Sequence, residues 1–270
     1  MFSPYYARAR RRGEADPLAH CALNIALYGP HRRWALTERG AAAVTRTPTA
    51  LAIGPSSLAW EGDALVLRFD ETTAPLPTRV RGVVRLHPAA PLHHAVRLDA
   101  EGRHRWWPVA PCGRVEVALS QPALRWRGTG YVDANAGDVA LERAFRSWTW
   151  SSARLRRGTA VLYDVVRRGG DSLSLALLFD RRGDVVPFAP PPVAPLPRTG
   201  WGIARSTRSE AGCPARVVRT LEDTPFYARS LVSTQLAGEA APAIHESLSL
   251  ERFAAPWVQW LLPFRMARAR

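Results

Sequence analysis

Hydrophobic residues that alternate with polar or small ones are the feature of this sequence that most restricts its fold. The alternation runs through positions 65–69, 114–119, 172–179 and 247–251. Because successive side chains of a β-strand point to opposite faces, each segment is typical of a strand with one buried face. Turn signals rich in glycine and proline separate these segments. The pattern predicts an all-β protein built from barrels or sandwiches.

Helical patterns are few. We expect a short helical turn at 138–145 and a short C-terminal helix at 256–266. The longest stretch without a charged residue, 17–31, has 15 residues, whereas a membrane-spanning helix needs about 18 or more apolar residues. The sequence therefore predicts no membrane-spanning helix.

A polar segment near the middle of the chain predicts a domain boundary. Residues 151–158 break the alternation and precede a new strand pattern at 161–166. We interpret 151–158 as a linker. The sequence then divides into two domains, 1–150 and 151–270.

The positive charge of the chain comes from arginine alone. All 37 basic residues are arginines, against 23 acidic residues, which gives a formal net charge of +14. A complete lack of lysine indicates genome base composition more than selection for a ligand, so the charge is weak support for nucleic-acid binding. The arginines are spread along the chain and no nucleic-acid-binding motif occurs, which leaves a nucleic-acid binder as a distant alternative.

Motifs for nucleotides, metals and organic cofactors are missing from the sequence. It has no phosphate-binding glycine loop, no Gly-x-Ser-x-Gly elbow and no His-Glu-x-x-His pair. The 3 cysteines are far apart and odd in number, which argues against a zinc–thiolate site and favours a reducing compartment. His87, His93 and His94 form a cluster that we interpret as solvated loop histidines, so we expect no metal.

Two segments combine aromatic residues with titratable ones. His104 and Trp106 are two positions apart, as are Tyr131 and Asp133, so each pair shares one face of a strand. A tyrosine and an aspartate that face the interior are costly to bury unless they are hydrogen-bonded. The alternative places Asp133 in solvent at a strand end, before an Asn/Gly turn, and the spacing alone leaves both open. The 10 tryptophans fit either a β-sheet core or an apolar cavity for a large hydrophobic ligand.

Longer segments around these residues resemble one family. They include Gly-Arg-His-Arg-Trp-Trp-Pro at 102–108 and Gly-Tyr-Val-Asp-Ala-Asn-Ala-Gly at 130–137, and such matches are far more specific than a short motif. The other matching segments are 2–7, 20–24, 26–29, 37–40, 52–58, 221–230 and 245–248. On these segments the sequence resembles the carotenoid 1,2-hydratase family, also called hydroxyneurosporene synthase, of phototrophic bacteria.

The resemblance implies two consecutive lipocalin-like β-barrel domains and a hydro-lyase of carotenoid biosynthesis. The implied reaction is the addition of water across the terminal C1=C2 double bond of acyclic carotenes such as neurosporene or lycopene, without an organic cofactor. Catalysis in the family is assigned to the two quoted segments, which here carry His104, Trp106, Tyr131 and Asp133. We expect further contacts with the carotene from Trp107, Trp126 and Asn135.

The start of the chain departs from the family's pattern. Family members begin a few dozen residues upstream, with a glycine- and aromatic-rich segment that supplies the opening strands. This sequence begins at Met1, Phe2 and Ser3, inside that pattern. We therefore expect an N-terminally shortened chain whose first barrel lacks its opening strands.

The implied chemistry needs an acid and a means to stabilise a cation. Protonation of the alkene at C2 leaves a tertiary cation at C1, which water captures. A free aspartic acid has a pKa of about 3.9, and burial among aromatic rings raises it, so we predict Asp133 as the proton donor. Trp106 would stabilise the cation through its π-face, and His104 would hydrogen-bond Asp133 or take the proton of the water. The alternative is a non-catalytic carotenoid or lipid carrier on the same fold.

The C-terminal segment predicts a contact with a membrane surface. Written as a helix, Trp257, Trp260, Leu261 and Phe264 form one apolar face, and arginines follow. Aromatic residues beside arginines are typical of an interfacial anchor. We expect a cytoplasmic protein bound peripherally to the anionic surface of the inner or photosynthetic membrane. The alternative is that this face packs on the second barrel.

Overall fold

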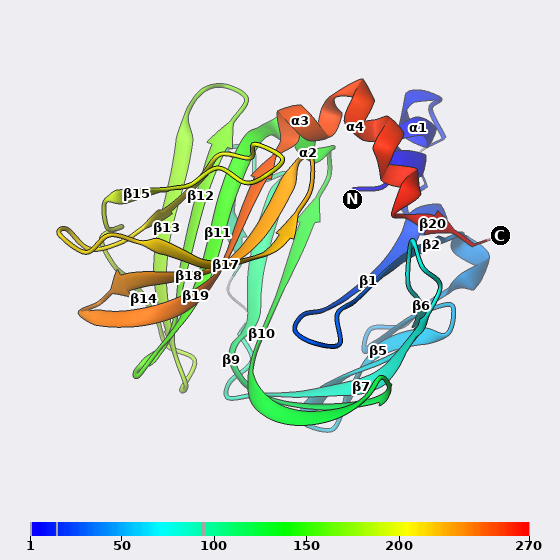
Figure 1. Cartoon of the computed structure of the whole chain (residues 1–270), viewed down its shortest axis with the longest axis horizontal. Helices are drawn as coiled ribbons and strands as arrows, with labels where there is room; N and C mark the ends of the chain where they lie inside the picture. The colour runs from blue at the N-terminus through cyan, green and yellow to red at the C-terminus, as the bar shows by residue number, and fades with distance from the viewer. Residues whose placement is uncertain (1, 15, 93–94, 270) are drawn as a thin grey trace. The chain divides into compact units, whose positions relative to one another are not determined.

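The computed structural model describes residues 2–14, 16–92 and 95–269 (Figure 1). These residues divide into two compact units. Unit 1 consists of Met1–Pro88, Gly113–Gly130 and Gln259–Arg270, and unit 2 consists of Ala89–Cys112 and Tyr131–Val258. Strands β9 (His104–Gln121) and β10 (Ala123–Gly137) contribute residues to both units.

Unit 1 is built on antiparallel strands that follow one another in the sheet order β9-β7-β6-β5-β4-β3, beside a smaller sheet β1-β2-β20. Its core contains Ala35, Phe69, Val80, Val117 and Leu119. The other elements of unit 1 are α1 (Pro4–Arg11), η1 (Pro17–His20), β1 (Cys21–Leu27), β2 (Arg33–Arg39), η2 (Ala41–Ala43), β3 (Val44–Arg46), β4 (Ala50–Ile53), β5 (Ser56–Glu61), β6 (Ala64–Thr72), β7 (Arg79–Pro88), η3 (Leu262–Phe264) and β20 (Ala267–Arg268).

Unit 2 is built on a seven-stranded sheet with the order β14-β13-β12-β11-β19-β18-β17. Figure 1 shows β18 and β19, in orange, beside β11, in green, although they are far apart in the sequence. The elements of unit 2 are β8 (Val96–Arg97), α2 (Leu141–Ala144), β11 (Phe145–Leu155), β12 (Gly158–Arg167), β13 (Ser172–Asp180), β14 (Val185–Pro187), β15 (Val193–Leu196), β16 (Arg205–Arg208), β17 (Arg216–Asp223), β18 (Tyr227–Leu236), β19 (Glu239–Ser249), α3 (Leu250–Ala254) and α4 (Pro256–Leu261), whose last residues belong to unit 1.

The two faces of this seven-stranded sheet carry different side chains. One face, which we call the core face, holds small and aliphatic residues such as Ala153, Leu162 and Val232. On it lies His245, fully buried, with its Nδ1 2.8 Å from Ser151 Oγ, and this burial lowers the pKa of the imidazole to about 4. The opposite face, which we call the aromatic face, carries rings that the next section describes.

The prediction of an all-β fold with few helices is confirmed, with one difference in the sheet of unit 2. Within the described residues β14 and β17 are the edges of that sheet, so it is an open, lipocalin-like sheet rather than a closed barrel. None of the helices in the described part of the chain is long and apolar enough to cross a membrane.

The predicted linker is wrong. Residues 151–158 form the end of β11, the turn and the start of β12, and their register is continuous. The segment looked like a linker because it is polar and breaks the alternation, yet Ser151 and Ala153 are buried on the core face. The division into domains at residue 150 stays a prediction, whereas the compact units of the structure are interleaved along the chain.

The C-terminal helix is shorter than predicted. It runs as α4 from Pro256 to Leu261 and continues only as the 3₁₀ turn η3. Pro263 explains this, because proline lacks the N–H of a helix interior and its ring clashes with the carbonyl of the preceding turn. Trp257, Trp260 and Phe264 are 45%, 68% and 64% exposed, so three of the four residues of the predicted apolar face lie in solvent.

Candidate active site

Asp133 is the centre of a hydrogen-bonded cluster in unit 2. Its Oδ2 accepts a 2.7 Å hydrogen bond from Nε1 of Trp106 and a 3.1 Å bond from the hydroxyl of Tyr131. Trp106 is completely buried, and Asp133 and Tyr131 are partly buried. The alternative that leaves Asp133 in solvent at a strand end is therefore wrong.

The shared strand face explains how the cluster forms. Tyr131 and Asp133 are two positions apart on β10, so both side chains leave the same side of the strand. Because both hydrogen bonds end on Oδ2, that atom is the carbonyl oxygen of the neutral acid, and the proton of a protonated Asp133 lies on Oδ1.

Burial raises the pKa of Asp133. The hydrogen bonds from Trp106 and Tyr131 favour the ionised form and oppose this shift, while the negative charge of Glu246 adds to it. Burial also raises the pKa of the Tyr131 phenol well above its usual value, and it does the same for Tyr163. Both phenols therefore stay protonated, and the raised carboxyl pKa makes Asp133 the group suited to deliver a proton.

Aromatic rings surround this acid. Trp106 packs edge-on against Tyr163, with ring centroids 5.6 Å apart, and Tyr131 packs against Trp150 at 5.0 Å. Trp148 adds a further contact with Tyr163 at 6.2 Å. Strand β11 supplies both tryptophans of the aromatic face, because Trp148 and Trp150 alternate with residues of the core face.

The indole N–H of Trp150 is a buried donor without a well-formed hydrogen bond among the described residues. It lies near the hydroxyl of Tyr131, where it favours the phenolate and partly offsets the rise in that phenol's pKa. A buried donor left this way loses roughly 1–3 kcal/mol of hydration. It is a polar atom of the site that a bound molecule could satisfy.

His104 bonds to different partners from the one predicted. Its Nδ1 lies 3.0 Å from Oδ2 of Asp99, and its Nε2 lies 3.1 Å from the carbonyl oxygen of Val139. A carboxylate and a carbonyl are both acceptors, so each ring nitrogen of His104 faces an acceptor of its own. The predicted hydrogen bond from His104 to Asp133 is not formed, because Asp99 and Val139 engage both nitrogens of the ring.

His104 and Asp99 instead fix the start of β9. Asp99 also accepts from the backbone N–H of His104 at 3.1 Å, across the short turn between β8 and β9. Both side chains are buried. Burial alone would raise the pKa of Asp99, but the hydrogen bonds from His104 outweigh it and lower that pKa. A role of His104 in catalysis stays a prediction; its contacts are those of a residue that holds the start of β9, the strand that also carries Trp106, in place.

The three predicted substrate contacts lie outside the Asp133 cluster. Trp107 follows Trp106 on β9 and so points to the opposite face, where the Arg105 guanidinium lies 5.8 Å from its ring centroid. Trp126 is 42% exposed on the part of β10 that belongs to unit 1. Asn135 is exposed on β10, two positions beyond Asp133. Their contacts with a substrate stay predictions.

Sequence reasoning missed Asp99, Tyr163 and Glu246. An acidic residue just before a strand that begins with histidine was a usable signal for Asp99. Glu246 lies in a segment that matches the family, but no chemistry was assigned to it. Tyr163 reaches the site only through the pairing of β12 with β11, which its own segment does not reveal.

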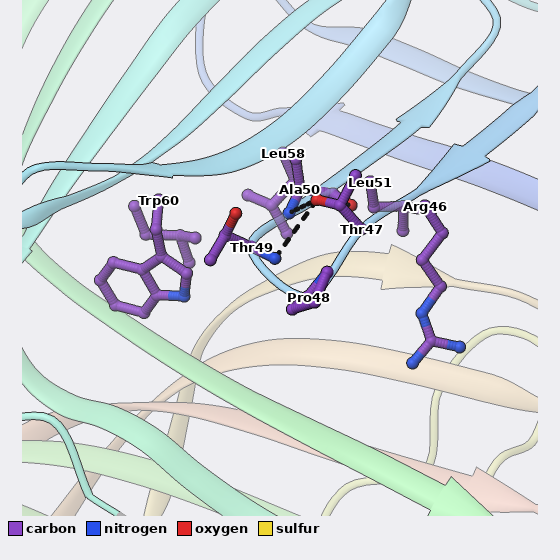
Figure 2. Close-up of a pocket in the computed structure, with 9 residues that line it drawn as sticks. Arg46, Thr47, Pro48, Thr49, Ala50, Leu51, Leu58 and Trp60 are labelled. Atoms are coloured by element: carbon purple, nitrogen blue, oxygen red, sulfur yellow. Dashed lines mark hydrogen bonds between the residues drawn. The ribbon is translucent and has the colours of Figure 1, made fainter.

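A surface hollow of about 490 Å³ lies in unit 1 (Figure 2). Among its lining residues, the hydroxyl of Thr47 accepts hydrogen bonds from the backbone N–H groups of Thr49 and Ala50. The hollow is lined by Arg46, Thr47, Pro48, Thr49, Ala50, Leu51, Leu58, Trp60 and Leu65. None of these is a predicted site residue and none is an acid, so the hollow does not supply the proton chemistry.

Within the described residues, no three histidine, cysteine, aspartate or glutamate side chains are grouped as metal ligands would be. Of the predicted loop histidines, His93 and His94 lie outside the described residues. His87 is described, and its Nδ1 lies 3.4 Å from Asp63.

The fold and the site define a lipocalin-like β protein with a carboxylic acid set among aromatic rings. The model of the family described as "Carotenoid hydratase CrtC" matches residues 1–270. This chain belongs to the CrtC family of carotenoid hydratases.

Individual relatives agree with this assignment. The acyclic carotenoid 1,2-hydratase of Thiocapsa roseopersicina is 58% identical over 270 residues, which cover 99% of this chain and 67% of that protein. The enzyme of the same name from Rubrivivax gelatinosus is 48% identical over 273 residues, with the same coverage of 99% and 67%. A solved structure assigned as AttH from Nitrosomonas europaea superposes with a TM-score of 0.61 at 16% identity, over 84% of this chain and 80% of that one, and it supports the fold alone.

Proposed function

We propose that this chain adds water across the terminal C1=C2 double bond of an acyclic carotene such as neurosporene or lycopene, in carotenoid biosynthesis. The observation that carries the proposal is the state of the Asp133 carboxyl. Burial raises its pKa, and hydrogen bonds from Trp106 and Tyr131 hold it in place. Membership of the CrtC family supports the same substrate class.

The reaction begins with transfer of the Asp133 proton to C2 of the alkene. The π-electrons of the double bond form the new C–H bond, and C1 becomes a tertiary cation. The oxygen of a water molecule then bonds to C1 and the water loses one proton to a base, so that one water is added in total. Hydration neither oxidises nor reduces the carotene, so it needs no electron carrier.

The aromatic rings around Asp133 suit the cation that this route creates. A cation over an aromatic ring in a desolvated site gains about 2 kcal/mol. Trp106, Trp150 and Tyr163 place several rings around one acid. Tyr163 packs against Trp106 and Trp150 packs against Tyr131, the two residues that donate to the acid. The same rings offer apolar surface to a long hydrocarbon.

The substitution Asp133→Asn tests the proposal. The chain would be co-expressed with the enzymes of a lycopene or neurosporene pathway. The pigments would be separated by chromatography and their masses measured by mass spectrometry. We expect the wild-type chain to form a hydroxylated carotene one water heavier than the substrate. We expect Asp133→Asn to form less than about 1% of it, since acid catalysis contributes roughly 10²–10⁴-fold.

Binding measurements separate an enzyme from a carrier. Asp133→Asn keeps the shape of the side chain, so it should still quench tryptophan fluorescence when carotene binds. A wild-type chain that binds carotene but forms no hydroxylated product would be the non-catalytic carrier, and near-normal turnover by a folded Asp133→Asn variant would move the proton donor elsewhere.

We further propose that the chain works at the cytoplasmic surface of an anionic membrane, where its water-insoluble substrate is dissolved. The support is the exposure of Trp257, Trp260 and Phe264 and the net charge of +14. The arginines that follow α4 contribute less to the attraction of anionic lipid than their number implies, because two of them already have partners within the protein. Arg265 lies 4.2 Å from the centroid of the Trp34 ring, and Arg268 donates to the buried Glu38.

Liposome flotation tests the membrane proposal. With vesicles that contain anionic lipid, we expect the double variant Trp257→Ala/Trp260→Ala to float at least tenfold less than the wild-type chain. Trp60→Ala removes another exposed tryptophan, remote in sequence, and serves as the matched control. Unchanged flotation of a folded double variant contradicts a role of α4 in binding.

A further inference from the structure

A second carboxylate lies on the aromatic face. Glu246 is on β19, directly opposite Trp150 of β11 and Arg229 of β18. Side chains directly opposite each other on neighbouring antiparallel strands point to the same face, with Cβ atoms about 5 Å apart. Glu246 therefore projects from the same face as Trp150, next to its ring.

The structure holds this carboxylate in one position. Oε1 of Glu246 accepts a 2.7 Å bond from Nη2 and a 3.0 Å bond from Nε of Arg229. The Glu246 side chain is 22% exposed and the Arg229 side chain 32%. The pair is thus partly withdrawn from solvent but not sealed from it, which is what a group that handles a water molecule requires.

Glu246 and Asp133 flank the same pair of rings. Tyr131 donates to Asp133 and packs against Trp150, and Trp150 is the cross-strand neighbour of Glu246. The negative charge of Glu246 also acts on the groups around these rings. After burial, it is a further cause of the raised pKa of Asp133 and of Tyr163. Two carboxyl groups held in different environments at one site are suited to opposite roles, one as acid and one as base.

We propose that Glu246 is the base of this site, which orients the attacking water beside the Trp150 ring and takes its proton. The proposal rests on the hydration proposed above and names the group that completes it. Asp133 loses its proton to C2, the water oxygen bonds to C1, and the O–H bond of that water breaks as its proton moves to Glu246. The proton then returns from Glu246 to Asp133 through solvent, which restores both groups.

The experiment separates the two proton transfers by using deuterated water. If Glu246 acts only after the cation forms, Glu246→Gln should still let Asp133 deliver deuterium to C2 and take a proton back. Recovered carotene should then contain deuterium at its ends, while hydroxylated product falls about 100-fold. Asp133→Asn should show neither deuterium exchange nor product.

The matched control is Glu222→Gln. Glu222 is opposite Arg229 on β17, on the same row of the sheet but on the far side of the arginine. The substitution makes the same change in charge, and we expect hydration within about twofold of the wild-type rate. Thermal unfolding followed by circular dichroism shows whether each variant is folded.

Each outcome decides one question. Hydration by Glu246→Gln within threefold of wild type overturns the proposal, and so does the loss of both exchange and product in a folded variant, since Glu246 would then act with Asp133 in the first step. A wild-type chain that neither exchanges deuterium nor hydrates carotene contradicts the proposed function instead.

A second variant applies if Glu246→Gln does not fold. Glu246→Asp keeps the charge and withdraws the carboxylate by one methylene. It should lower hydration at least tenfold with exchange retained, and unchanged hydration would overturn the proposal.

Discussion

The indole of Trp106 and the hydroxyl of Tyr131 donate to the same oxygen of Asp133, at 2.7 and 3.1 Å. The two donors come from different strands, β9 and β10, so the carboxyl is held from two directions. This arrangement keeps Oδ2 occupied and leaves Oδ1 to carry the proton. The orientation of the acid is therefore set by a buried ring as much as by its own strand.

We expect Trp106→Phe to weaken hydration and to shift its pH dependence. The indole N–H favours the ionised form of Asp133, so its loss raises the pKa of that carboxyl further. The protonated acid is the active form, and activity falls as pH rises through its pKa. The descending limb of the pH–rate profile should therefore move to higher pH, while the maximal rate falls about tenfold because orientation is lost. Profiles of wild type, Trp106→Phe and the remote Trp60→Phe check this, and an unshifted limb contradicts it.

We expect Asp133→Asn to stabilise the folded chain at neutral pH. The folded pKa of Asp133 is raised, so its contribution to stability is fully present below the unfolded value of about 3.9 and is lost as pH rises through the folded value. At pH 8 the wild-type chain must bury a charge that asparagine lacks. Thermal unfolding should give a higher midpoint for Asp133→Asn at pH 8, with the difference shrinking toward pH 4. A lower midpoint at pH 8 would be contrary to this account.

We expect Asp99→Asn to destabilise unit 2. The substitution replaces a charge-assisted bond to a buried imidazole, and the free energy of unfolding should fall by about 2 kcal/mol. The pKa of Asp99 is lowered in the fold, so its stabilisation is present above pH 3.9 or so and is lost as pH falls through the folded value. Chemical unfolding at pH 7 and pH 3.5 checks the sign. Equal effects at both pH values would show that charge is not the cause.

We expect Gly137→Ala to disturb the His104 ring. A Cβ at this position would lie 2.6 Å from Cδ2 of His104, whereas a Cβ at Gly128, also on β10, meets nothing within 4 Å. The buried ring has no room to retreat, so the Gly137 variant should lose stability and hydration together, while Gly128→Ala keeps both. The His104 ring signals in NMR spectra report the displacement directly, and unchanged signals would exclude it.

Part of this site could be predicted from the sequence. Alternation alone places Tyr131 and Asp133 on one face, and the two quoted segments identify the strands that carry the acid and its tryptophan donor. The partners of these residues follow from strand pairing, which no single segment reveals. Glu246 joins the site because β19 pairs with β11, and His104 bonds to Asp99 because the chain turns between β8 and β9.

The wrong prediction of a linker at 151–158 has a related cause. Ser151 belongs to a strand whose buried face is lined with small residues, so its polarity says little about its exposure. Periodicity detects strands whose buried residues are large and aliphatic. It fails where a serine is satisfied internally, here by His245.

Trp150 and Ser151 are neighbours in the chain, yet one faces the acid and the other faces the packed core. An insertion or deletion of one residue within β11 would exchange them, bringing serine to the site and driving tryptophan into a core of alanines. From Ser147 to Leu155, where the pairing with β12 stays in one register, the strand therefore cannot gain or lose a single residue without exchanging its two faces. Side chains on the aromatic face of β11 can be exchanged one at a time, while changes in length are confined to its ends.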